Sequence, residues 1–133
     1  SRREGTNETV FKAEVPSKIK AHLEELTDRG DSDLIQAIAD ILAEQYLEVL
    51  GLAGTEFVAT LKRVQTRRRA ISWVLVLTLV GKVVDPTDAC AAYSSKTTDA
   101  NVKLNVATSD GGALVANAPD AISCETKFTN TTR

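Results

Sequence analysis

The sequence predicts an α+β fold in which one long helix packs on a curved antiparallel sheet of four to five strands. Apolar side chains recur at helical spacing at Leu34, Ile38, Leu42 and Tyr46, which indicates a helix with a broad apolar face. The segments that follow have the β-branched composition and short alternation of strands, and residues 70–84 are the most apolar of them. A helix and a sheet that each have one apolar face bury them against each other in an α+β domain.

The first half of the chain predicts one strand and two helices. A short strand is expected at residues 9–15. An extra short helix is expected from Ser17, a possible N-cap, to just before Gly30. The long helix is expected to begin at residues 31–33, which offer capping side chains, and to end at Gly51.

The second half predicts four strands joined by turns. They are expected at residues 56–65, 70–84, 101–108 and 113–123, the last being weak because Asn117 and Pro119 interrupt it. A charged turn at 66–69 follows the first strand, and Ser-Asp-Gly-Gly at 109–112 is a hairpin-turn signal. This element order favours a meander. The predicted organisation is a flexible N-terminal arm at residues 1–8, a single domain at 9–124 and a C-terminal tail at 125–133.

The composition is that of one globular domain. The chain has 133 residues, of which 43% are hydrophobic and 26% charged, with a formal net charge of −2. This charge gives no global attraction to nucleic acid or to an anionic membrane. The longest apolar run, residues 70–80, is shorter than the roughly 20 residues that a spanning helix needs, so we expect no membrane span.

Two cysteines and two glycosylation sequons favour a secreted protein. Asn7 and Asn130 each begin an Asn-x-Thr sequon near a chain end. We predict that Cys90 and Cys124 form one disulfide, which would tie the weak last strand to the loop after the most apolar strand and contribute about 2–4 kcal/mol. The alternative is two reduced, buried cysteines in a cytosolic protein.

The sequence offers no set of residues that assembles into a catalytic or metal site. His22, on the predicted short helix, is the single histidine, and a lone surface histidine rarely marks a site. The spacing of the two cysteines does not match a zinc site, and no glycine-rich loop precedes a helix as in phosphate-binding sites. We therefore predict that the chain is not an enzyme and that it uses no metal and no cofactor.

Basic residues gather around one predicted hairpin tip. Lys62 and Arg63 lie on the strand that leads to it, and Arg67, Arg68 and Arg69 form the turn. One interpretation is a solvated turn that keeps an apolar hairpin soluble. The other is a contact surface for the carboxylates or phosphates of a partner. Nucleic acid is a weaker candidate, because no aromatic residues alternate with the arginines to stack on bases.

Three segments resemble the secreted, type 2-like branch of the cystatin family. Residues 33–46 resemble the cystatin helix and its Ala-x-x-Tyr ending, residues 61–81 resemble the first cystatin hairpin, and residues 102–124 resemble the last hairpin, which closes on a cysteine. The resemblance implies a helix wrapped by a five-stranded antiparallel sheet. It also implies a wedge, made of the N-terminal arm and two hairpin loops, that inserts into the active-site cleft of papain-like cysteine proteases.

Both inhibitory loop motifs of that family are missing here. The place of Q-x-V-x-G is taken by Arg67, Arg68, Arg69, Ala70 and Ile71. The place of the Pro-Trp loop is taken by Ser109, Asp110, Gly111 and Gly112. We therefore expect a diverged, secreted module that binds a protein partner through these two tips and the N-terminal arm. A papain-like cysteine protease is one candidate partner.

Two other functions remain open at this point. One is a cone-shaped α+β domain that encloses a small molecule, and the other is a structural or oligomerisation module. An enclosed pocket needs a few polar groups among apolar ones, and residues 73–79 offer almost none, which favours a filled core. The sequence does not determine the oligomeric state.

Overall fold

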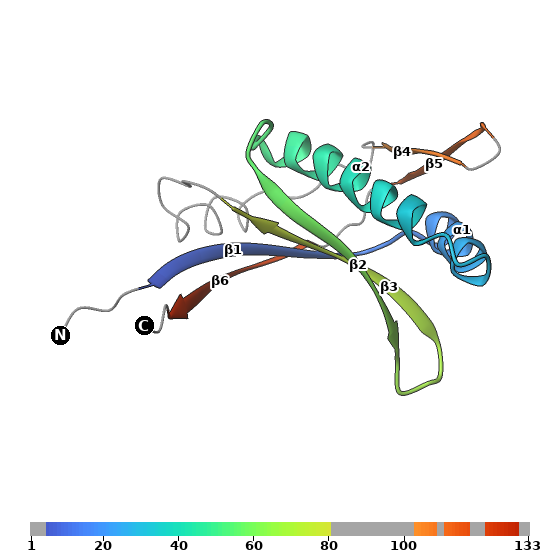
Figure 1. Cartoon of the computed structure of the whole chain (residues 1–133), viewed down its shortest axis with the longest axis horizontal. Helices are drawn as coiled ribbons and strands as arrows, with labels where there is room; N and C mark the ends of the chain where they lie inside the picture. Colours follow the sequence, from blue (N-terminus) through green and yellow to red (C-terminus); the bar gives the residue numbers. More distant parts are fainter. Residues whose placement is uncertain (1–4, 81–102, 109–110, 118–121, 131–133) are drawn as a thin grey trace.

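The computed structural model describes residues 5–80, 103–108, 111–117 and 122–130 (Figure 1). The helices and strands follow one another in the order β1 (Gly5–Glu14), α1 (Ser17–Asp28), α2 (Ser32–Leu50), β2 (Phe57–Gln65), β3 (Ile71–Leu79), β4 (Lys103–Ala107), β5 (Ala113–Asn117) and β6 (Ile122–Asn130). Two helices and antiparallel sheets confirm the predicted α+β class and the extra short helix.

The helices begin and end at the residues that their local signals indicate. The Asp31 side chain caps α2 by accepting a hydrogen bond from the Leu34 N–H at 3.2 Å. Gly51 ends α2 with a φ of 75°, in the left-handed region that favours glycine. α1 differs slightly from the prediction, because Pro16 occupies the N-cap position and Ser17 is the first helical residue.

The main sheet has four strands in the order β2-β3-β1-β6, which is not the meander that the element order favoured. β1 pairs antiparallel with both β3 and β6, and β2 pairs antiparallel with β3. β1 and β2 are therefore parallel to each other, with β3 inserted between them. The physical reason is that α1 and α2 return the chain to the starting end of β1, and β3 then folds back into the space between β1 and β2.

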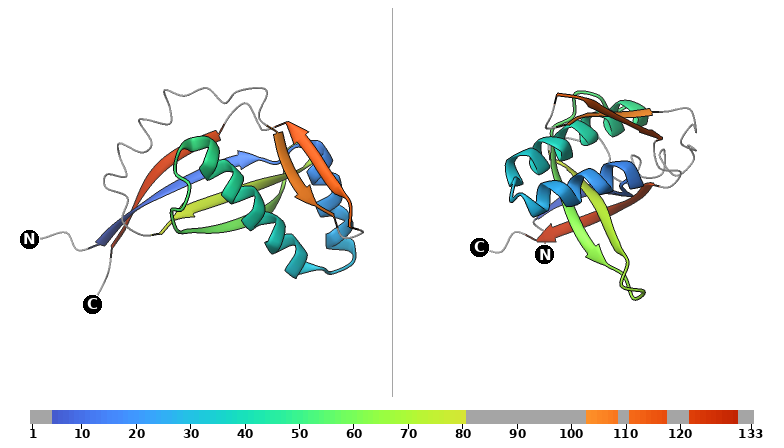
Figure 2. Two further views of the ribbon diagram at one scale, coloured as in Figure 1. Left: turned by 90° about the horizontal axis from the view of Figure 1, so that it is seen from above. Right: turned by 90° about the vertical axis from the view of Figure 1, so that its right-hand side faces the viewer.

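The helices lie between this sheet and a separate two-stranded sheet formed by β4 and β5 (Figure 2). Leu104 and Val106 of β4 are completely buried and belong to the same core as the inward side chains of α2. The Gln45 side chain of α2 donates to the Asn105 carbonyl and accepts from the Asn105 N–H, both at 2.9 Å. The apolar face of α2 is wide because it is covered on two sides.

The outer strands extend further than the sequence predicts. β1 begins at Gly5, so residues 5–8 of the expected arm pair with β6, and β6 continues to Asn130 through most of the expected tail. The expected last strand is two strands, β5 and β6, that belong to different sheets. These terminal segments are mainly polar and give no local signal, because each becomes a strand only by pairing with the other.

No helix in the described part of the chain is both long enough and apolar enough to cross a membrane.

Candidate functional site

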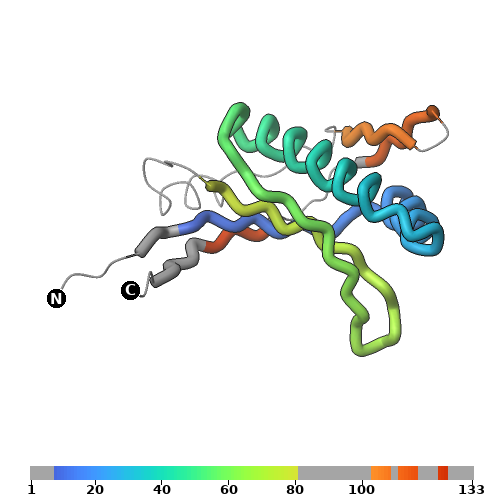
Figure 3. The backbone as a smooth tube through the Cα atoms, in the orientation of Figure 1, coloured from blue at the N-terminus to red at the C-terminus, as the bar shows by residue number. Residues whose placement is uncertain are grey.

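The β2–β3 hairpin projects beyond the rest of the main sheet (Figure 3). Its neighbour β1 ends at Glu14, which pairs with Val74, and one further bond joins the Val15 N–H to the Trp73 carbonyl at 2.8 Å. Among the described strands, none therefore lies beside the last residues of β2, the turn at 66–70 and the start of β3. This projection carries the arginines that the sequence marked as a contact surface.

The turn is a tight loop of Arg67, Arg68 and Arg69 between Thr66 and Ala70. The Thr66 N–H donates to the Ala70 carbonyl at 2.8 Å, and the Arg69 N–H donates to the Thr66 carbonyl at 3.0 Å. Arg69 has a φ of 60°, and it is the one non-glycine residue with positive φ in the described part of the chain. A three-residue hairpin loop of this type needs a left-handed residue at its third position, and glycine normally supplies it.

The β4–β5 hairpin has the same hydrogen-bond pattern at its turn, and it has a glycine at the position that needs a left-handed conformation. Its Thr108 N–H donates to the Gly112 carbonyl at 2.9 Å, and its Gly111 N–H donates to the Thr108 carbonyl at 3.2 Å. Gly111 has a φ of 88° and takes the place that Arg69 takes in the other loop. The same chain thus places glycine at the strained position of one loop and arginine at that of the other.

The three arginines of the loop, which we call the arginine tip, are exposed to solvent and form no ion pair with any described residue. Lys62 is also exposed, and it too forms no ion pair with any described residue. Arg63 differs, because its guanidinium binds the Glu24 carboxylate of α1 through two contacts of 3.0 and 3.3 Å. Lys62 and Arg63 are neighbours in the sequence, but adjacent residues of a strand point to opposite faces, so only Arg63 reaches α1.

The structure does not bring the predicted contact residues together on one surface. Ala70 is exposed beside the arginine tip, but Ile71 is half-buried and packs against the core. Gly111 and Gly112 lie in the β4–β5 hairpin, and Figure 1 shows α1 between that hairpin and the arginine tip. Ser109 and Asp110 lie outside the described residues.

The start of β1 is also far from the arginine tip. Thr9 pairs with Leu79, at the end of β3 that is opposite to the tip, and β1 begins still further away at Gly5. A wedge made of the N-terminal arm and two hairpin loops would need all three at one edge. In this fold the arginine tip is a separate surface.

The chain has no significant match among protein-family models, curated proteins or solved structures. The cystatin resemblance therefore stays a prediction.

The predicted modification sites lie on β6 and β1 or outside the described residues. Cys124 of β6 is half-buried and packs against the core, while Cys90 lies outside the described part, so the disulfide between them stays a prediction. Asn7 pairs in register with Phe128, and Asn130 pairs with Gly5. The asparagines of the two sequons are therefore close together in the backbone, at the end of the sheet where β1 begins and β6 ends.

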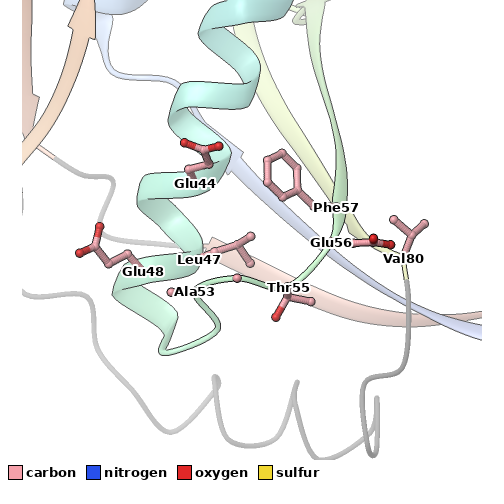
Figure 4. A pocket seen from close by; sticks show the side chains of 9 residues that line it. Glu44, Leu47, Glu48, Ala53, Thr55, Glu56, Phe57 and Val80 are labelled. Carbon is pink, nitrogen blue, oxygen red and sulfur yellow. The ribbon is translucent and has the colours of Figure 1, made fainter.

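A surface hollow of about 620 Å³ lies between the end of α2 and the start of β2 (Figure 4). Leu47 and Phe57 line it together with the carboxylates of Glu44, Glu48 and Glu56. Figure 4 shows that Glu48 and Glu56 point away from each other, so their carboxylates do not converge on one ligand position. Among the described residues, no group of three or more His, Cys, Asp or Glu side chains could hold a metal ion.

His22 does not lie in a catalytic arrangement with described residues. It is 8% exposed, its Nδ1 is 3.9 Å from a carboxylate oxygen of Glu25, and its Nε2 is buried without a hydrogen-bond partner. The sequence suggested an exposed histidine, but the residue lies on the buried side of α1 beside Ile19, Leu23 and Leu26.

Proposed function

We propose that this chain is a protein-binding module that uses the arginine tip to bind an acidic surface of its partner. Three adjacent guanidinium groups at a projecting turn can each donate several hydrogen bonds to carboxylates. No described acidic side chain neutralises them. An excess of local positive charge on a chain with a net charge of −2 favours a partner with the opposite local charge.

The observation that carries the proposal is the left-handed conformation of Arg69. A non-glycine residue in that region costs about 1–2 kcal/mol, and the β4–β5 loop avoids the cost by using Gly111. Solubility alone does not require this cost, because Arg67 and Arg68 already make the turn charged. Backbone strain that a simple substitution would remove is most often kept at binding sites.

We also propose that the protein works in an oxidising compartment. A Cys90–Cys124 disulfide and two usable sequons, Asn7 and Asn130, are properties of a secreted chain. We keep a diverged cystatin-like inhibitor as one form of the proposal. A papain-like protease is the less favoured partner, because its apolar cleft would have to desolvate three guanidinium groups and because the arm and the second loop lie elsewhere.

An enclosed small-molecule site is less well supported. A cavity between α2 and the sheet, lined by Phe11, Tyr46 and Leu75 among others, has a volume of about 10 Å³. That is close to the smallest space that holds one water molecule. A ligand of ordinary size needs about 300 Å³ or more.

The proposal is tested with an acidic polymer as the probe. Fluorescently labelled polyglutamate is titrated with the wild-type chain and with the double variant R67Q/R68Q, and binding is followed by anisotropy. We expect the double variant to bind at least about tenfold more weakly, because two charge-assisted contacts are lost. The matched control is K18Q/K20Q, which removes the same charge from α1 and should bind like the wild type.

Equal weakening by both double variants would mean that net charge, and not the arginine tip, determines binding, and it would refute the proposal. The protease form is tested separately by titrating papain with the wild-type chain. No inhibition at micromolar concentration would remove a papain-like protease as the partner.

A further inference from the structure

We propose that the outer edge of β2 accepts an extended acidic segment of the partner as an additional strand, with its carboxylates directed at the arginine tip. This inference rests on the proposed function and adds the conformation and chemistry of the bound partner. It depends on three properties of the hairpin: a free backbone edge, a run of unpaired positive charge and an alternating face beside that edge.

β2 is an edge strand of the main sheet, and no strand in the described part of the chain pairs with the other side of its backbone. In an antiparallel ladder, alternate residues bond to the neighbouring strand and the residues between them point outward. The bonds from the Val80 N–H to the Glu56 carbonyl and from the Thr66 N–H to the Ala70 carbonyl show that even-numbered positions bond to β3. The odd-numbered residues of β2 therefore direct their N–H and C=O groups outward.

One outward group of β2 is covered by a described side chain, and the outward groups nearer the arginine tip are open. The Gln36 side chain of α2 donates to the Ala59 carbonyl at 2.9 Å and so covers the edge near the middle of the strand. The backbones of Leu61, Arg63 and Gln65 have no corresponding bond to any described residue. Such a row of unpaired groups is the feature that binds extended peptides by strand addition.

The charges next to this open edge select the occupant. Lys62 and the arginine tip place unpaired positive charges at the end of β2 where the backbone is open. A second copy of the chain is a poor occupant, because two β2 edges would bring two Lys62 side chains and two arginine tips to one interface. An extended segment rich in Glu or Asp has the complementary charge.

The face of the hairpin turned away from the helices adds a side-chain pattern. Val58 and Val64 of β2 are 55% and 43% exposed, and Lys62 lies between them on that face. A bound strand would place every second side chain beside these residues. We therefore infer a segment in which acidic residues alternate with small or β-branched ones.

The experiment uses the full chain and a fluorescein-labelled decapeptide of alternating threonine and glutamate. Binding is measured by anisotropy, and amide hydrogen exchange is measured by NMR with and without saturating peptide. We expect exchange at the outward amides of Leu61, Arg63 and Gln65 to slow by about tenfold or more, while the amides of Lys62 and Val64 change little because they already bond to β3.

Two N-methylated peptides provide the matched comparison. One is methylated at all glutamates and the other at all threonines, so each loses the amide donors of one side of the strand. Strand addition predicts that one of them binds about a hundredfold more weakly, because about three hydrogen bonds are lost, and that the other binds normally. The variant Q65P removes one outward N–H and should weaken binding about fivefold, and the peptide pair decides the matter if that variant does not fold.

The outcomes separate this inference from the proposed function. If R67Q/R68Q weakens binding while the outward amides exchange unchanged and both methylated peptides bind alike, strand addition is wrong and the arginine tip remains the binding site. If binding is weakened neither by R67Q/R68Q nor by methylation of either peptide, both the proposed function and strand addition are wrong. If the same amides are protected from exchange without peptide, because two copies of the chain associate, then the edge of β2 binds a second copy. That result also overturns strand addition by an acidic partner.

Discussion

Replacing Arg69 by glycine should stabilise the protein. Arg69 holds a φ of 60° at the third position of the β2–β3 loop, where a side chain clashes with the backbone and glycine does not. The Arg69 N–H bond to Thr66 and the Thr66 N–H bond to Ala70 do not involve the Arg69 side chain, so the variant keeps the loop intact.

The expected gain follows from two opposing terms. Relief of the left-handed conformation contributes about 1–2 kcal/mol. The greater freedom of glycine in the unfolded chain costs about 0.4–1 kcal/mol. At the middle of both ranges, the net increase in the free energy of unfolding is about 0.8 kcal/mol, which raises the melting temperature of a chain of this size by about 2–4 °C.

The assay is urea unfolding of the wild type, R69G and R68G, followed by Trp73 fluorescence and analysed at a common slope. R68G is the matched control, because it removes the same charge from the same loop at a residue without positive φ. Its free energy of unfolding should fall by about 0.4–1 kcal/mol, because glycine makes the unfolded chain more flexible and relieves no strain at this position.

The sign of the difference in the free energy of unfolding between R69G and R68G decides whether Arg69 is strained. If R69G is no more stable than R68G, Arg69 is not strained, and the reasoning that links its conformation to a retained function fails. Equal stabilisation of both variants would point to repulsion among the three arginines as the relevant cost.

Three further predictions concern contacts and modification elsewhere. Q45E should weaken the attachment of β4 to α2 by about 1–2 kcal/mol, because a carboxylate cannot donate to the Asn105 carbonyl, and amide exchange should rise in β4–β5 but not in the main sheet. E24Q should cost about 0.5 kcal/mol in urea unfolding, and the difference from the wild type should shrink in about 1 M salt, because its ion pair with Arg63 is partly exposed. Secreted material should show no free thiol at Cys124 by mass analysis without reductant, whereas two free thiols would contradict the predicted disulfide.

Local signals predicted the parts of the fold that depend on nearby residues. The Asp31 cap, the Gly51 stop and the apolar spacing of α2 identify a helix without knowledge of what it contacts. The Ser-Asp-Gly-Gly run likewise identified the turn between β4 and β5, where Gly111 has positive φ. In each case the signal and the structure that it determines lie within a few residues of each other.

Pairing between distant segments could not be predicted in this way. The order β2-β3-β1-β6 depends on which strands meet after the helices have packed, and several orders satisfy the same apolar alternation. The mainly polar segments 5–8 and 126–130 become strands only because they pair with β6 and β1 respectively. The placement of β4–β5 on the far side of the helices depends on the second apolar side of α2, which the sequence shows only as an unusually wide face.

The same division applies to the candidate site. By itself, the sequence determined that a long helix packs on antiparallel strands and that Arg67, Arg68 and Arg69 lie at a turn, because helical spacing, caps and charge are local properties. Only the tertiary structure decided that this turn projects alone, that Arg63 pairs with Glu24, and that the backbone of β2 is open beside the arginine tip. These features depend on which distant backbones fill each edge of the sheet, and β1 ends before it reaches the tip.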